Sequence, residues 1–214
     1  MATKRLLLTR SRHDLLNAYL YAYCEDVITE ARSLGWQVDR MEDADNTSSQ
    51  LQSRLSKTPY NFVFFNGHGN RDCVCGDKNG EIITTVQGGL LGRSITYARS
   101  CDALTALGKE AVAQGCPAFI GYRTSFLLPY TNEYALTPLK DPAARPVIEI
   151  SNTVPRLILK GATVRKAVEF ARSKSGRMLI RMLGSGEPLD SAVFRALYHN
   201  HDALSFEGDP DSHV

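Results

Sequence analysis

YNFVFFNGHG, residues 60–69, is the stretch of this sequence that decides the fold. Its first part, residues 60–65, is a continuous apolar run of strand length, which is typical of a central parallel strand covered on both faces. A glycine-containing turn over residues 66–70 follows it. We therefore expect a parallel sheet that has this strand in its interior.

Strands and helices alternate on both sides of this stretch. Before it we predict two strands and two helices: strands over residues 4–9 and 36–41, and helices over residues 13–34 and 48–56, the second capped by Asn46 or Thr47. After it we predict a hairpin, two strands and a helix: the hairpin over residues 73–84 with its turn at 77–80, strands over 94–98 and 116–122, and a helix over 103–114. This alternation predicts an α/β fold with a mostly parallel sheet.

The last third of the chain is less regular. Residues 126–146 contain four prolines and predict an extended loop with one short helix. Helical spacing predicts a helix over residues 154–173, which include Gly161, and another over residues 188–198. Residues 178–183 fit either a strand or a helix.

The composition is that of an ordinary globular protein. The 214 residues are 43% hydrophobic and 22% charged, which excludes a disordered chain and predicts one domain, residues 1–206, with a frayed polar tail, residues 207–214. The net charge of +2 argues against nucleic acid as a partner. No apolar run is long enough for a membrane span or a secretory leader, so we expect a cytoplasmic protein with no membrane partner.

Five cysteines, an odd number, predict free thiols rather than a disulfide framework. Cys73 and Cys75 form a close pair, but a structural zinc site needs four ligands and usually two such pairs. The other cysteines stand singly, and His199 and His201 lie far away in the sequence. We therefore expect neither a metal site nor a cofactor.

Two chemically competent residues follow two of the predicted strands. His68 lies in the turn after residues 60–65, and Cys101 follows the strand over residues 94–98. Ligands of open parallel sheets bind outside the carboxyl ends of the strands, so neighbouring strands would bring both side chains to one edge. A thiol beside a histidine is a nucleophile with its base, and the N–H groups of Gly69 and Cys101 are candidates to stabilise an oxyanion. A lone histidine is often only a turn residue and a lone cysteine is often core, but the pair favours catalysis.

Three segments resemble the caspase-like, or clan CD, cysteine peptidases. The segment FVFFNGHG, residues 62–69, looks like their strand followed by His-Gly, and ITYARSC, residues 95–101, looks like their strand that ends in the nucleophile. Residues 107–122 are similar to the helix and strand that follow the nucleophile in the CHAT and gingipain-like members. The resemblance implies a three-layer sandwich, a His68/Cys101 dyad with a backbone oxyanion hole, and cleavage after one strongly preferred P1 side chain.

The sequence around the expected nucleophile departs from the caspase pattern. It reads RSCD, residues 99–102, and His68 precedes Cys101 by 33 residues, where caspases have about 50. The aspartate specificity of caspases is therefore not carried over to this chain.

Four carboxylates, those of Asp72, Asp77, Glu81 and Asp102, lie close to the dyad in the sequence. Asp72, Asp77 and Asp102 are candidates to line a pocket that selects a basic P1 side chain through a charge-assisted pair. Each also fits a turn or surface position, and Asp102 fits the N-cap of the helix that follows it. Relatives that favour Arg or Lys support the pocket.

We expect a cysteine endopeptidase that acts on a protein or peptide through an acyl-enzyme. Such an enzyme needs control, by an activating partner, a small signalling molecule or cleavage within residues 126–146, and the resemblance implies a role in bacterial defence or cell death. Two alternatives stay open. One is a catalytically inactive caspase-like module that binds a partner or a signalling ligand. The other is a different thiol hydrolase whose base, His199 or His201, follows the nucleophile.

Overall fold

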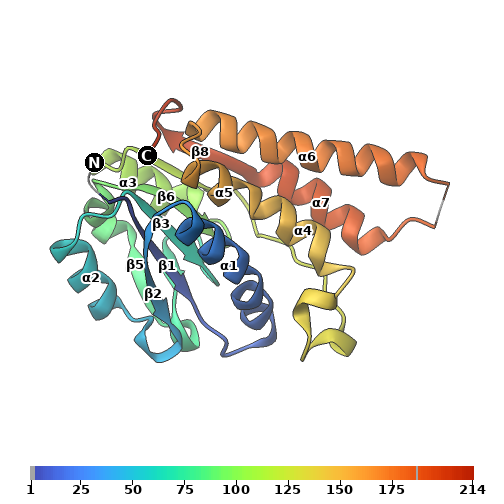
Figure 1. The fold of residues 1–214 in the computed structure, drawn as a ribbon, viewed down its shortest axis with the longest axis horizontal. Coiled ribbons are helices and arrows are strands. Elements are labelled where there is room, and N and C mark those ends of the chain that lie inside the picture. Colours follow the sequence, from blue (N-terminus) through green and yellow to red (C-terminus); the bar gives the residue numbers. More distant parts are fainter. Residues whose placement is uncertain (1–2, 187) are drawn as a thin grey trace.

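Within the residues that the computed structural model describes, 3–186 and 188–214, a six-stranded sheet forms the middle of the molecule (Figure 1). The strands run in the order β2, β1, β3, β6, β7, β8, and they span Gln37–Glu42, Arg5–Arg10, Phe62–Asn66, Ile95–Arg99, Ala118–Tyr122 and Leu204–Gly208. The first five are parallel, and β8 is antiparallel to β7. The predicted α/β fold with its mostly parallel sheet is confirmed.

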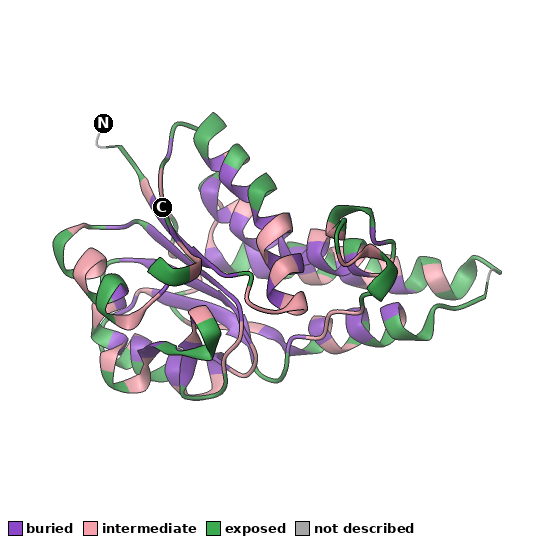
Figure 2. Ribbon diagram, turned by 90° about the horizontal axis from the view of Figure 1, so that it is seen from below, coloured by how far each residue is buried: buried purple, intermediate pink, exposed green. Residues whose placement is uncertain are grey.

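Helices cover both faces of the sheet, as a strand buried on both sides requires (Figure 2). One face carries α1 (Leu15–Ser33), α4 (Ala144–Ser151), α5 (Thr153–Leu159), α6 (Val164–Gly184) and α7 (Ser191–Ala203). The other carries α2 (Ser48–Lys57), α3 (Lys109–Ala113) and the predicted hairpin, formed by β4 (Cys73–Cys75) and β5 (Glu81–Thr84). No helix in the described part of the chain is long and apolar enough to cross a membrane.

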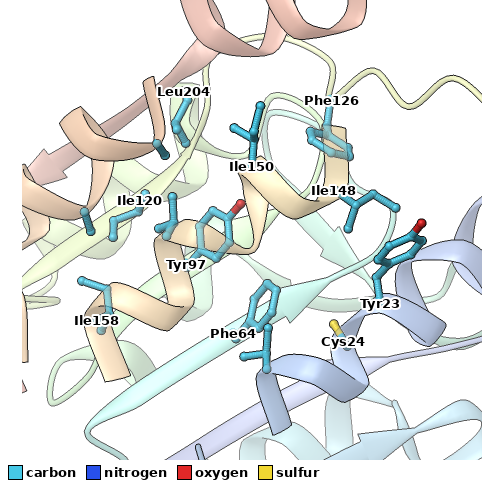
Figure 3. Packing of buried hydrophobic residues seen from close by; sticks show 14 of the residues in the cluster. Tyr23, Cys24, Phe64, Tyr97, Ile120, Phe126, Ile148, Ile150, Ile158 and Leu204 are labelled. Atoms are coloured by element: carbon cyan, nitrogen blue, oxygen red, sulfur yellow. The ribbon is translucent and has the colours of Figure 1, made fainter. Parts of the chain in front are cut away.

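The pleat of the strands divides the core into two halves. In β1, Leu6 and Leu8 face the layer of α1 and α4–α7, whereas Leu7 faces the layer of α2 and α3. In the first half, Phe64 of β3 stacks on Tyr97 of β6, with ring centroids 5.0 Å apart (Figure 3). Each such buried side chain contributes about 1.5–3 kcal/mol. Burial on both faces explains why the apolar run of β3 is continuous rather than alternating.

The single helix expected over residues 154–173 is wrong, because α5 and α6 share that stretch. α5 ends at Leu159, and Gly161 just beyond it has φ +82° and donates its N–H to the Ile158 carbonyl at 2.9 Å. Thr163 then caps α6 by accepting a backbone N–H of its first turn. Residues 178–183 belong to α6 and are therefore helical.

One buried carboxylate holds the segment between β7 and α4. Asp141 is fully buried and accepts a hydrogen bond from the Tyr19 hydroxyl at 2.7 Å. The N–H groups of Thr131 and Ala143 also donate to it, each at 2.8 Å. Burial alone would raise the pKa of Asp141, but these donors outweigh it and the pKa lies below its ordinary value. The expected loop over residues 126–146 is thus tied to α1, and it ends early because α4 begins within it.

The C-terminal residues pack against the body of the protein instead of fraying. Glu207 and Gly208 pair with β7 as part of β8. The Asp209 N–H donates to the Pro117 carbonyl at 2.9 Å, and the Ser212 carbonyl accepts the first N–H of α6 at 3.0 Å. The expected start of the tail therefore falls inside a strand, while the single-domain organisation stays a prediction.

Candidate active site

The strand register brings two of the predicted site residues to the same edge of the sheet. β3 and β6 are parallel neighbours, and their last residues, Asn66 and Arg99, are partners in the register. His68 and Cys101 each stand two residues beyond those partners. Because parallel strands end at one edge, the two side chains start from adjacent points of that edge.

The turn after β3 touches the turn after β6. A Cβ atom on Gly69 would collide with the Ser100 hydroxyl and would lie 2.6 Å from the Cys73 carbonyl oxygen. The position therefore requires glycine because of the close approach of its neighbours. The peptide that follows His68 consequently lies against the residue that precedes Cys101.

Two backbone N–H groups at this edge are unused. Gly69 faces Val74 in an isolated antiparallel bridge, flanked on each side by a hydrogen bond between the two segments, at 2.9 and 3.0 Å. At such a position the residue's own N–H points away from its partner segment. Among the described residues, neither the Gly69 N–H nor the Cys101 N–H donates a hydrogen bond. Their use as oxyanion donors stays a prediction.

An aspartate at the start of α1 holds the imidazole of His68. Asp14 Oδ2 lies 2.8 Å from His68 Nε2, and Asp14 Oδ1 accepts the Asn17 N–H at 2.8 Å as the N-cap of the helix. Burial alone would raise the pKa of Asp14, but the Asn17 N–H and His68 outweigh it, and the pKa lies below its ordinary value. An ionised Asp14 favours the tautomer with the proton on Nε2, which leaves Nδ1 of the neutral ring as a base.

Sequence reasoning missed Asp14. The helix predicted over residues 13–34 includes this position, and an aspartate in front of an apolar helical pattern indicates an N-cap rather than a site residue. Asp14 reaches His68 because β1 and β3 are neighbours in the sheet and α1 follows β1 closely. No local sequence pattern indicates that β1 and β3 are neighbours.

Cys101 is half-buried and begins a sharp turn of the backbone. The next residue, Asp102, has φ +54°, a left-handed conformation that non-glycine residues rarely adopt, and its N–H donates to the Thr124 carbonyl at 3.1 Å. The Asp102 carbonyl accepts the Thr105 N–H at 2.9 Å, so its main chain starts the helix, and the expected side-chain cap is wrong. That helix opens with a π-turn over Leu104–Gly108 before α3.

The other cysteines occupy different environments. All five are free, and Cys24, Cys73 and Cys116 are buried. Burial raises the pKa of Cys73 to about 12 and that of Cys116 to about 11, and it also raises the pKa of the half-buried Cys75. Since the thiolate is the reactive form, these thiols are poor nucleophiles. Cys101 is the cysteine that follows a strand of the central sheet.

A buried arginine joins the ends of β3 and β6 beneath the site. Arg99 is fully buried and donates to Asn66 Oδ1 and to Asn152 Oδ1, each at 2.7 Å. Its guanidinium lies 5.1 Å from the centre of the Phe64 ring. These contacts tie both strand ends to the junction of α4 and α5 through the side chain of Arg99, two residues before Cys101.

The carboxylates expected to select a substrate have separate surroundings. Asp72 is exposed and lies 3.5 Å from its neighbour Arg71. Asp77 is half-buried, with Oδ1 3.9 Å from His13 Nδ1, and Asp102 directly follows the expected nucleophile. In the described part of the chain no hydrogen bond joins these three residues, and their role in P1 selection stays a prediction.

The alternative bases lie on α7. His199 Nε2 lies 3.0 Å from the Thr124 hydroxyl and 2.9 Å from a backbone carbonyl oxygen, and His201 Nδ1 lies 3.0 Å from another. Thr124 also binds the Asp102 N–H, so His199 reaches the turn after the cysteine through one residue. His68, by contrast, has a carboxylate partner, which supports it as the base.

A cluster of metal-ligating side chains lies at the same edge. Within residues 3–186 and 188–214, His13, Asp14 and His68 form the group whose ligand atoms all lie within 4.8 Å of one another. The sulfur atoms of Cys73 and Cys75 are 4.0 Å apart and are not part of such a group. The sequence predicts no metal site, and this cluster arises because the tertiary structure joins two distant segments.

No protein-family model matches this chain, and no curated protein matches it in sequence. Solved structures do match. The Arg-specific cysteine proteinase gingipain R covers 98% of this chain with a TM-score of 0.64 at 10% identity. The complex of the pro- and mature domains of RgpB from Porphyromonas gingivalis covers 99% with a TM-score of 0.62 at 10% identity. The chain spans about half of these structures, 47% and 48% of their length. The likeness confirms the expected caspase-like fold, in which helices cover both faces of a mostly parallel sheet.

Proposed function

We propose that this chain is a cysteine endopeptidase in which Cys101 is the nucleophile, His68 its general base and acid, and Asp14 a positioning residue for His68. The observation that carries the proposal is the contact between Gly69 and Ser100, which packs the turn after β3 against the turn after β6. A half-buried thiol, an imidazole with its carboxylate, and two unused N–H groups then share one edge of the sheet. Acyl transfer to a thiol needs this set of groups.

In the proposed reaction, His68 Nδ1 takes the thiol proton while the Cys101 sulfur bonds to the scissile carbonyl carbon. The carbonyl electrons move to the oxygen, which the N–H groups of Gly69 and Cys101 stabilise. The C–N bond then breaks, and His68 gives its proton to the leaving amine. Water, deprotonated by the same ring, attacks the thioester and releases the acid product and the thiol. Asp14 orients the ring and stabilises the imidazolium in both steps.

The proposed substrate is a protein or peptide with a basic P1 residue. Asp77 and Asp102 supply two carboxylates near the proposed dyad, with Asp72 as the third candidate. A charge-assisted pair with Arg or Lys gives such a carboxylate its selectivity. Gingipain R is described as Arg-specific, which supports the same choice for this chain.

The proposed biological setting rests on the sequence resemblance. It comprises membership of the CHAT or gingipain-like branch, a cytoplasmic location, and a role in bacterial defence or cell death. It also includes control by an activating partner or a small signalling molecule. The proposed peptidase activity can be tested independently of each of these proposals.

The first test is cleavage of a fluorogenic peptide library that varies at P1. We expect the wild type to cleave after Arg or Lys, and Cys101→Ala to lose about a thousandfold or more of that activity. Cys75→Ala is the matched control, because Cys75 is also half-buried but lies in the hairpin, and it should keep the wild-type rate.

Alkylation distinguishes an enzyme that awaits its activator from an inactive module. With iodoacetamide we expect Cys101 to react faster than Cys75, and His68→Ala to slow the reaction of Cys101 while the rate of Cys75 stays unchanged. Equal rates at both cysteines in the wild type would favour the inactive, partner-binding module. A slower Cys101 in His199→Ala but not in His68→Ala would assign the base to His199.

A further inference from the structure

We infer that His13, Asp14 and His68 form a binding site for a divalent transition-metal ion, and that an ion bound there blocks the proposed peptidase. The inhibition rests on the function proposed above, whereas the binding does not. The cluster joins the segment before α1 to the turn after β3. It combines two imidazoles and one carboxylate, all of them half-buried.

The ligand atoms already lie near the separations found around a coordinated ion. His68 Nε2 and His13 Nε2 lie 2.8 and 3.2 Å from the same oxygen, Asp14 Oδ2. Ligands at the usual zinc distances are about 3.3 Å apart at the corners of a tetrahedron. All three atoms lie within 4.8 Å of one another, so small side-chain rotations seat an ion between them.

The surroundings of His13 complete the coordination chemistry. Its Nδ1 is buried and has no hydrogen-bond partner among the described residues, while Asp77 Oδ1 lies 3.9 Å away. A carboxylate beyond the outer nitrogen of a ligating histidine favours the tautomer whose other nitrogen binds the metal. Asn79 Oδ1 lies 3.1 Å from the ligating Nε2. The side chains of His68 and Asp14 are 32% and 34% exposed, which leaves a fourth position open to water.

The donor set selects the class of ion. Two imidazole nitrogens and one carboxylate oxygen suit Zn²⁺, Co²⁺ or Ni²⁺, whereas Ca²⁺ and Mg²⁺ prefer oxygen ligands throughout. Cys73 and Cys75 are the competing soft ligands, but they supply only two sulfur atoms. The site we infer is therefore a nitrogen and oxygen site without thiolate ligands.

An ion bound at this cluster prevents His68 from acting as the proposed base. Coordination through Nε2 replaces the hydrogen bond between Nε2 and Asp14, and the single proton of the neutral ring moves to Nδ1. Nδ1 then has no lone pair left to take a proton from the thiol. The imidazole no longer accepts the Cys101 proton, so acylation stops while the fold is unchanged.

Binding is measured with Co²⁺ on the full chain carrying Cys101→Ala, with Zn²⁺ as competitor. We expect saturation at one ion per chain, visible d–d bands, and no intense sulfur-to-cobalt charge-transfer band in the near ultraviolet. Adding His13→Gln should weaken binding by about tenfold or more. His199→Gln is the matched control, since its ring lies outside the cluster, and it should leave binding unchanged. An unchanged affinity in the folded His13→Gln variant, or a thiolate band, overturns the site.

Inhibition is measured separately on the chain with Cys101 intact, by peptide cleavage and by the rate of Cys101 alkylation. We expect Zn²⁺ to slow both and a chelator to restore both. The Zn²⁺ concentration for half inhibition should rise by about tenfold or more in His13→Gln and stay constant in His199→Gln. Equal inhibition of the two variants would mean that Zn²⁺ acts on the Cys101 thiol itself, which refutes the regulatory part. Failure of the peptidase proposal appears instead as absent cleavage with cobalt binding intact.

Discussion

Two aspartates show how the edge of the sheet differs from the helical layer. Asp141, in front of α4, is fully buried and its oxygens are taken by donors from its own loop and from Tyr19 of α1. Asp14, in front of α1, is half-buried and divides its oxygens between the helix cap and His68. Both carboxyl groups have lowered pKa values. The donors to Asp141 serve the structure alone, whereas Oδ2 of Asp14 also contacts a ring that changes its protonation state in the proposed reaction.

Backbone strain follows the same division. Near the edge, left-handed conformations occur at residues that are not glycine: Asp102 with φ +54°, and Lys78 and Asn79 with φ +50° and +60°. In the helical layer, Gly161 takes that conformation, at little cost. Strained backbone at non-glycine residues thus occurs near the proposed site, whereas in the helical layer glycine takes the left-handed conformation without strain.

The largest expected loss of stability comes from filling the close contact between Gly69 and Ser100 at the edge of the sheet. Gly69→Ala places a methyl group against Ser100 and the Cys73 carbonyl, so we expect a loss of about 2–3 kcal/mol in the free energy of unfolding. Cleavage should fall about a hundredfold or more, because the oxyanion donor moves. Denaturant titration and kcat/KM measure the two effects.

Gly184→Ala in α6 is the matched control for that variant. Its added Cβ meets nothing within 4 Å, and helix propensity predicts a gain of up to about 1 kcal/mol. If Gly69→Ala proved as stable and as active as Gly184→Ala, the two turns would not be packed as described.

The second prediction concerns Asp14, whose substitution should lower the catalytic rate while the stability of the fold is kept. Asparagine is as good an N-cap as aspartate, so Asp14→Asn should leave the unfolding free energy within about 0.5 kcal/mol of the wild type. Without the carboxylate, the His68 tautomer and imidazolium lose their support, and kcat should fall about a hundredfold with little change in KM. Asp190→Asn, at the N-cap of α7, is the control and should keep kcat. Equal kcat values in the two variants would remove Asp14 from the proposed machinery.

The smallest expected effect concerns Asp141 and the way the unfolding free energy depends on acid pH. Asp141→Asn loses part of its acceptor set, and we expect about 2 kcal/mol of destabilisation at pH 7. The folded pKa of Asp141 is lowered, so its ionised form stabilises the protein above pH about 4 and this contribution is lost as pH falls through the folded pKa. Acid titration of the unfolding free energy should therefore be flatter for the variant than for the wild type. Parallel acid curves would contradict the role given to this carboxylate.

Much of the fold was predictable because its determinants are local. Residues 62–65 are all apolar, which predicts a central strand buried on both faces. Gly161 followed by Thr163 contains the stop and start of two helices. We nevertheless expected one helix there, since the apolar spacing continues across the break. The strand β8 was missed because its partner β7 lies more than 80 residues earlier, and its polar end gave no β pattern.

The sequence by itself determined the order of strands and helices and the placement of His68 and Cys101 just beyond two strands. Hydrophobic periodicity and turn chemistry act over a few residues, so they can be recognised without the fold. Only the tertiary structure decided that Asp14 and His13 meet His68 and that Gly69 lies against Ser100. These contacts depend on which strands are neighbours and in which register, and that is set by packing of the whole core rather than by any local pattern.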